Sequence, residues 1–239
     1  MNTLAIRQTL ANLGPRKAEL ELALVGDNQG DDQVAVIVKE LTHAEVSQLL
    51  AEGDYTKPSV VAHHLTPEQL LGALQRLGAK WGNLRGVETE TLLPLKEQVS
   101  DFMLSALLHG NENIHKDLIE IILNDTLAED VLVAIALFEP GCPEFLIEKD
   151  WATAQLGTWQ ELYMRIRDIL PTAFQRLSKE VTALYKNADD KEGEEEETPM
   201  PRKAERFLRR TLQALVTKAD ELGDATPTVN KAKAIFEDF

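Results

Sequence analysis

Residues 130–138, DVLVAIALF, constrain the fold most, because every residue after the first is apolar. No face of such a segment can meet water without cost, so it must lie inside a core. Its length and periodicity fit a buried strand as well as a buried helix. Helical patterns flank it on both sides, and it contains Ala134 and Ala136. We therefore expect a central helix that is buried all round.

Signals for helix starts recur in the segments around it. Thr66 and Pro67 form a cap and a first turn, and the helix they open is expected to end at Gly78. Thr42 and Glu45 form a capping box for a helix over residues 43–52. Apolar residues at helical spacing predict further helices over residues 94–108, 113–122, 159–169 and 174–186. The sequence thus predicts a mainly α, irregular multi-helix domain.

Residues 18–40 are the exception to this helical pattern. Leucines occupy every second position from Leu20 to Leu24, and valines do so from Val34 to Val38. Between the two runs lies GDNQGDD, whose composition is typical of a turn. Two alternating runs around such a loop are the pattern of a β-hairpin. A small N-terminal hairpin over residues 18–40, and with it an α+β fold, is the alternative.

Charge is distributed unevenly along the chain. The net charge is −15, and residues 189–198 (DDKEGEEEET) hold seven acids and one lysine. Like charges at this density repel one another, so residues 189–200 are expected to form an acidic linker. The sequence therefore divides into an acidic, mostly helical domain over residues 1–188, the linker, and a basic amphipathic helix with a tail over residues 201–239.

Several classes of function find no support in the sequence. An acidic domain repels phosphates, which argues against nucleic-acid binding by residues 1–188. No segment reaches the ~20 apolar residues that span a bilayer. The N-terminus lacks the apolar core of a signal peptide, so a cytoplasmic location is expected. Cys142 is the only cysteine, and no nucleotide-binding or serine-hydrolase motif occurs. We predict no catalytic residue and no cofactor.

Two Glu-x-x-His pairs are the only candidates for a metal site. They are Glu40 with His43, and Glu112 with His115. On a helix this spacing puts a carboxylate and an imidazole on one face, and two such pairs with two further glutamates build a di-iron site in helical bundles. Both pairs straddle predicted helix starts, so ordinary surface residues are the favoured interpretation. A helical di-metal enzyme remains an alternative.

Residues 201–222 carry the most distinctive pattern. Leucines recur at helical spacing, and the first turns are rich in arginine, so an amphipathic helix is predicted. Its apolar face would either pack on its own domain, or dock on a partner protein or a second copy. In a third interpretation, its cations contact the phosphates of nucleic acid or an anionic membrane. The residues predicted to bind a partner are Arg202, Arg206, Phe207, Leu208, Arg209, Arg210, Leu212 and Leu215.

The absence of catalytic motifs favours a non-catalytic role. We expect a protein–protein interaction protein, either an adaptor or a subunit of a larger assembly, with the C-terminal helix as its contact element. Its partner would be another protein or a second copy of the chain. The first alternative is a nucleic-acid-associated subunit that contacts phosphates through the arginines of residues 202–210. The second is the di-metal enzyme on the two Glu-x-x-His pairs.

Overall fold

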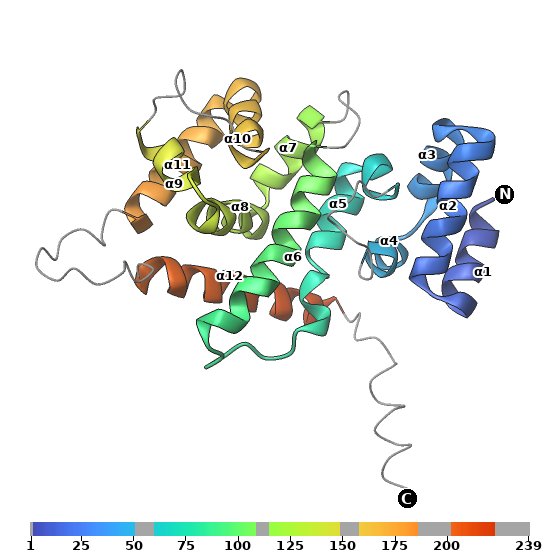
Figure 1. Ribbon diagram of the computed structural model, residues 1–239, viewed down its shortest axis with the longest axis horizontal. Helices are drawn as coiled ribbons and strands as arrows, with labels where there is room; N and C mark the ends of the chain where they lie inside the picture. Colours follow the sequence, from blue (N-terminus) through green and yellow to red (C-terminus); the bar gives the residue numbers. More distant parts are fainter. Residues whose placement is uncertain (1, 51–59, 109–114, 149–157, 186–201, 223–239) are drawn as a thin grey trace, which may run out of the picture.

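The computed structural model describes residues 2–50, 60–108, 115–148, 158–185 and 202–222, and within these ranges the chain is helical with no β-strand (Figure 1). The first four helices are α1 (Thr3–Leu13), α2 (Pro15–Gln29), α3 (Asp31–Glu40) and α4 (His43–Leu50). They are followed by η1 (Ala62–His64), α5 (Pro67–Leu74), η2 (Leu77–Lys80), α6 (Thr89–Leu108), α7 (His115–Asn124), α8 (Thr126–Phe138), α9 (Cys142–Glu148), α10 (Thr158–Ile169), α11 (Pro171–Tyr185) and α12 (Arg202–Glu221). No helix in these ranges is both long enough and apolar enough to cross a bilayer.

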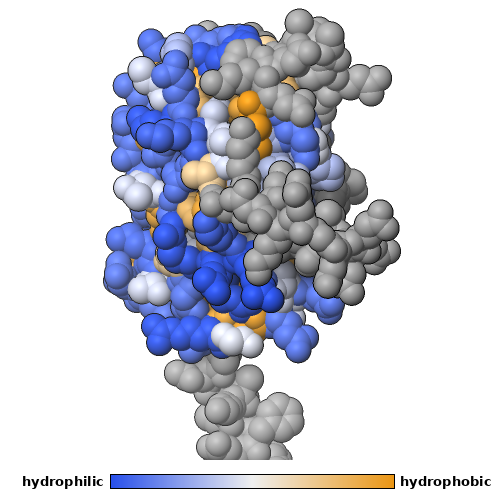
Figure 2. Space-filling view, turned by 90° about the vertical axis from the view of Figure 1, so that its left-hand side faces the viewer, coloured by the Kyte–Doolittle hydropathy of each residue, from blue (hydrophilic) through white to orange (hydrophobic). Residues whose placement is uncertain are grey.

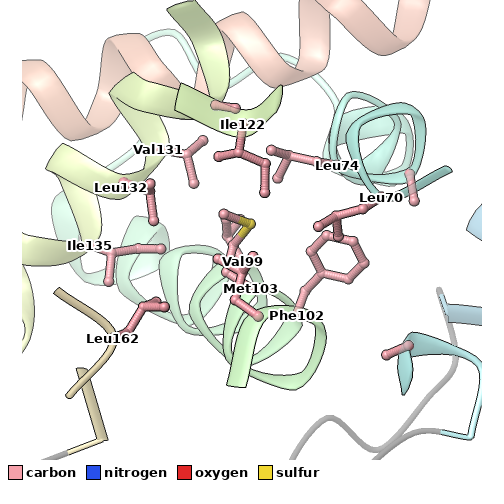
Figure 3. Packing of buried hydrophobic residues seen from close by; sticks show 14 of the residues in the cluster. Leu70, Leu74, Val99, Phe102, Met103, Ile122, Val131, Leu132, Ile135 and Leu162 are labelled. Carbon is pink, nitrogen blue, oxygen red and sulfur yellow. The ribbon is translucent and has the colours of Figure 1, made fainter. Parts of the chain in front are cut away.

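Helix α8 lies at the centre of the part of the molecule formed by α5–α12, which we call the main body, as predicted. Every residue from 131 to 137 is buried. Helices α6, α7, α9, α11 and α12 all pack against α8. In Figure 3, Met103 of α6 faces Val131 and Leu132 of α8, and Leu74 of α5 comes from the opposite side. The prediction of a central helix buried all round is therefore confirmed.

The two predicted helix caps are also present. The Thr66 hydroxyl accepts from the Gln69 N–H at 3.2 Å, and the Gln69 side chain accepts from the Thr66 N–H at 3.0 Å. Thr42 and Glu45 form the same reciprocal pair, at 2.8 and 3.3 Å. The Gln69 amide also donates to the carbonyl of Leu41 at 2.7 Å. One residue thus closes the first turn of α5 and ties α5 to the end of α3.

Helix boundaries differ from the prediction where a tertiary contact intervenes. Helix α6 begins at Thr89, so Pro94 lies inside the helix and does not open it. The Thr89 hydroxyl donates to Glu205 of α12 at 2.5 Å, which holds the additional turn. Helix α5 ends at Leu74, before Gly78.

The alternative of a hairpin over residues 18–40 is wrong, because α2 and α3 occupy this segment. The leucines and valines do occupy alternate positions, but in a helix residues two apart point to opposite faces. Leu22 is buried, whereas Leu20 and Leu24 lie on the opposite side of α2 and are 55% and 56% exposed. In α3, Val34 and Val38 are buried and Val36 is exposed. The segment GDNQ continues α2, and only Gly30 breaks the helix.

Gly30 joins α2 to α3 with φ at +89° and ψ at 162°, a conformation that is essentially limited to glycine. A Cβ at this position would meet no atom within 4 Å, so the cost of a side chain lies in the backbone alone. We expect Gly30→Ala to lower the free energy of unfolding by roughly 1–3 kcal/mol. Urea unfolding followed by circular dichroism measures this change.

Gly26 provides the matched control. It lies inside α2 without a positive φ, and its Cβ would make ordinary contacts at 3.5 Å or more. Gly26→Ala should leave stability unchanged or raise it by up to about 1 kcal/mol. Equal losses for the two variants would contradict the role assigned to Gly30.

Candidate functional site

The apolar face of α12 is buried within its own domain. Phe207, Leu208, Leu212 and Leu215 are each at most 5% exposed. In Figure 1 the helix lies below α8 and crosses behind the lower part of α6, and it contacts η2, α8, α6 and α11. The amphipathic helix predicted after residue 201 is therefore present, and of the three interpretations of its apolar face the structure shows packing on its own domain. These four predicted partner-binding residues contact the chain itself in this structure.

Helix α12 and η2 approach each other at backbone distance. A Cβ on Gly78 would lie 2.4 Å from the nitrogen of Val216 and 2.6 Å from the carbonyl oxygen of Leu215. Nearby, the backbone N–H of Leu84 donates to the side chain of Gln213 at 2.9 Å. Only glycine allows this packing, so Gly78 serves the docking of α12 and does not terminate α5.

The four arginines predicted to contact a partner divide into two groups. Arg209 donates to the carbonyl of Val87 and, at 3.0 Å, to Glu205. Arg210 lies 4.8 Å from the centre of the Phe207 ring and 3.6 Å from the Asp130 carboxylate. Arg202 and Arg206 are exposed in the first turns of α12. Arg209 thus holds α12 on its own domain, Arg210 contacts Asp130 while 66% of its side chain stays exposed, and Arg202 and Arg206 face outward.

A cluster of carboxylates surrounds the contact of Arg210. Burial raises the pKa of Asp130; Arg210 opposes this shift and Glu129 adds to it. Burial also raises the pKa of Glu180, and the charges of Asp130 and Glu129 add to the shift. No local spacing in the sequence predicts this cluster, because Glu129 and Asp130 come from α8, Glu180 from α11 and Arg210 from α12.

The structure does not bring the two Glu-x-x-His pairs together. Glu40 accepts a hydrogen bond from the hydroxyl of Thr3. The His43 ring lies against Gly72, where a Cβ would be 2.6 Å from Nδ1. Glu112 and the side chain of His115 lie outside the described residues. Among the side chains that are described, no three of His, Cys, Asp or Glu gather closely enough to hold a metal ion.

A buried ion pair joins α6 to the end of α8. Lys96 is 6% exposed, and its Nζ lies 2.7 Å from Oε1 of Glu139. The Ser100 hydroxyl donates to the same oxygen at 2.9 Å, and Ser100 and Glu139 also line an open cleft. Both donors, Lys96 and Ser100, are engaged by Glu139. The arrangement therefore acts as a cross-brace between two helices.

Cys142 lies close to this ion pair at the start of α9. Burial raises the pKa of its thiol to about 12, and the charges of Glu139 and Glu144 add to the shift. The thiol is therefore protonated at neutral pH and is a poor nucleophile. Its position in the structure is that of a packing residue.

Large apolar side chains that remain exposed are concentrated on the first three helices. Among the described residues, those of this kind are 52–64% exposed and all lie on α1, α2 or α3: Leu4, Leu13, Leu20, Leu24 and Val36. We call these five residues the N-terminal apolar set. Figure 2 shows the end of the molecule opposite α1–α3, where the coloured surface is mostly hydrophilic with small apolar areas. Single exposed leucines are common, but confinement to one end of a protein is a stronger sign of a contact region.

Comparison of the chain with protein-family models, with curated proteins and with solved structures gave no match. Its function is therefore inferred from its own geometry.

The close approach of η2 and α12 leads to a test of the docking of α12. Gly78→Ala forces a methyl group against the backbone of Val216, and overpacking of this kind costs roughly 1–3 kcal/mol. Chemical denaturation should show a loss of that size, and limited proteolysis should cut α12 faster than in the wild type. Gly26→Ala is the control, because Gly26 has no positive φ and its Cβ would make only ordinary contacts at 3.5 Å or more. A loss for Gly78→Ala no larger than that for Gly26→Ala would contradict the tight contact.

The carboxylate cluster predicts a dependence of stability on pH. Folding raises the pKa of Glu180, so protonation of this carboxyl stabilises the folded state. This stabilisation is fully present below the unfolded pKa and is lost as pH rises through the folded pKa. Glu180→Gln should therefore be more stable than the wild type at pH 8, and this advantage should disappear below pH 4. Unfolding curves at both pH values measure it, with Glu120→Gln on α7 as the control for net charge. An advantage that persists unchanged at low pH would refute the assignment.

Proposed function

We propose that this chain is a non-catalytic interaction protein, either an adaptor or a subunit of a larger assembly. The observation that carries the proposal is the confinement of the N-terminal apolar set to α1–α3. Burial of apolar surface stabilises a complex by about 25 cal/mol per Å², and these are the large apolar side chains that the described residues expose. We therefore place the main contact on α1–α3, with the exposed Arg202 and Arg206 of α12 as a second contact.

The platform beneath these side chains is well ordered by its internal contacts. Helix α2 packs against α1, α3 and α4. Arg7 of α1 donates to Glu45 of α4 at 2.8 Å and to the carbonyl of Glu40 at 2.8 Å. A surface held in place before binding loses little conformational freedom when a partner arrives. This supports a role in recognition.

The polar clusters of the main body support the same proposal. Lys96 and Ser100 both bond Glu139, and Thr89 and Arg209 both bond Glu205. Lys96, Ser100 and Thr89 thereby join α6 to other segments, whereas Arg209 and Glu205 pair within α12. A catalytic group needs to reach a substrate, and these groups are instead committed to joining helices.

The nucleic-acid alternative has weaker support. Arg209 is engaged within the chain, and Arg210 contacts Asp130 although its side chain is 66% exposed, while Arg202, Lys203 and Arg206 are exposed at the start of α12. Affinity for nucleic acid grows with the number of phosphates that are neutralised, and the protein carries a net charge of −15. Contact with a protein partner is the more favourable use of these cations.

The test compares two variants that add the same charge to different helices. Leu20→Glu with Leu24→Glu alters the N-terminal apolar set, whereas Thr172→Glu with Gln175→Glu alters exposed polar positions of α11. We expect the wild type and the α11 variant to capture the same protein, which can be the chain itself, from native lysate that is cross-linked before washing, and the α2 variant to lose at least about nine-tenths of it, since central apolar contacts dominate binding. Circular dichroism checks that all three are folded. Undiminished capture by the α2 variant, or no capture by any of them, would overturn the proposal.

A further inference from the structure

Four exposed side chains on α2 follow the spacing of a helix–helix seam. The intervals between them are three, four and three residues, as in the core positions of a coiled coil, and they are Lys17, Leu20, Leu24 and Asp27. They lie on the side of α2 opposite its buried residues Ala18, Leu22 and Val25. Helix α2 thus has one face in the core of its own domain and a second, narrower face suited to another helix.

The two ends of this seam carry opposite charges. Lys17 lies toward the N-terminal end of α2 and Asp27 toward its C-terminal end, and neither has an ion-pair partner among the described residues. Leu20 and Leu24 between them are more than half exposed. The seam is therefore apolar in the middle, positive at one end and negative at the other.

The seam on α2 is complementary to the same seam on a second copy that runs in the opposite direction. Leu20 and Leu24 lie two residues on either side of Leu22, and Lys17 and Asp27 lie five residues on either side. In an antiparallel pair about a two-fold axis at Leu22, each Leu20 meets Leu24 of the second copy, and each Lys17 meets Asp27 of the second copy. A parallel pair would instead place like charges together at both ends.

We infer that a second copy of this chain binds along α2 and forms an antiparallel, two-fold symmetric dimer. The inference rests on the proposed function, since it names the occupant of the same contact region. Charge complementarity selects this occupant. A partner of unrelated sequence would have to reproduce the same reversed order of charges, whereas the chain itself supplies it.

The size of the seam limits the strength of the dimer. Ten residues of helix are about 15 Å long. Two such segments bury less than the roughly 800 Å² per partner of stable complexes, although Leu13 and Val36 lie on the neighbouring helices. The dimer is therefore weak, with a dissociation constant of about 10–500 μM, at the low end of specific interfaces.

Charge reversal tests the pairing directly. Sedimentation equilibrium of the full chain from about 5 to 500 μM should show a monomer–dimer equilibrium in the wild type. Lys17→Glu places two acids together at each end of the seam, and Asp27→Lys places two lysines together. Each single variant should weaken the dimer by about tenfold, a size expected for two reversed surface pairs.

Mixing the two single variants provides the rescue. In a heterodimer of Lys17→Glu with Asp27→Lys, both ends again pair opposite charges, so the mixture should associate with near wild-type affinity. The double variant, which exchanges both charges within one chain, should do the same. Because each protein in the mixture is a variant that dimerises poorly alone, rescue cannot be attributed to misfolding. Lys39→Glu, an exposed change on α3, is the control for net charge.

The possible results separate this inference from the proposed function. A chain that stays monomeric throughout, or single variants that associate like the wild type, or a mixture without rescue, would overturn the antiparallel dimer. If the chain is monomeric while the change of Leu20 and Leu24 to Glu still abolishes capture from lysate, the proposed function stands and the occupant is a different protein. Rescue in the mixture supports the dimer whatever the lysate experiment shows.

Discussion

Burial of α8 on all sides is the constraint on which the arrangement of the main body depends. A helix without a polar face must be covered completely, and α6, α7, α9, α11 and α12 together supply the cover. Helix α12 comes from near the end of the chain to take its place, and its backbone meets Gly78 at a distance that no other residue allows. This packing buries the apolar face of α12.

That use of α12 moves the candidate contact region to the other end of the molecule. With Phe207 and Leu212 buried, the large apolar side chains that the described residues expose lie on α1–α3. The same helices are joined by single glycines at Gly14 and Gly30, whose positive φ angles turn the chain without a loop. Tight connections hold α2 between its neighbours and leave one of its faces outward.

Polar groups in the main body serve mostly as braces between helices. Glu139 accepts hydrogen bonds from Lys96 and Ser100 of α6. Glu205 accepts hydrogen bonds from Thr89 of α6 and from Arg209, one turn further along α12. Such pairs define which helix lies against which, because an unpaired member would be costly to bury. In the same way Asp130 of α8 contacts Arg210 of α12, and burial raises the pKa values of Asp130 and of the nearby Glu180.

The sequence by itself determined the features that depend on neighbours along the chain. The caps at Thr42 and Thr66, the buried helix over residues 130–138 and the amphipathic helix after residue 201 all follow from spacings of three or four residues. Only the tertiary structure decided what covers each apolar face. Alternating leucines fit a strand or a helix with two apolar sides, and packing against α1, α3 and α4 selects the helix. The Lys96–Glu139 pair joins residues 43 apart, and no local pattern records such a distance.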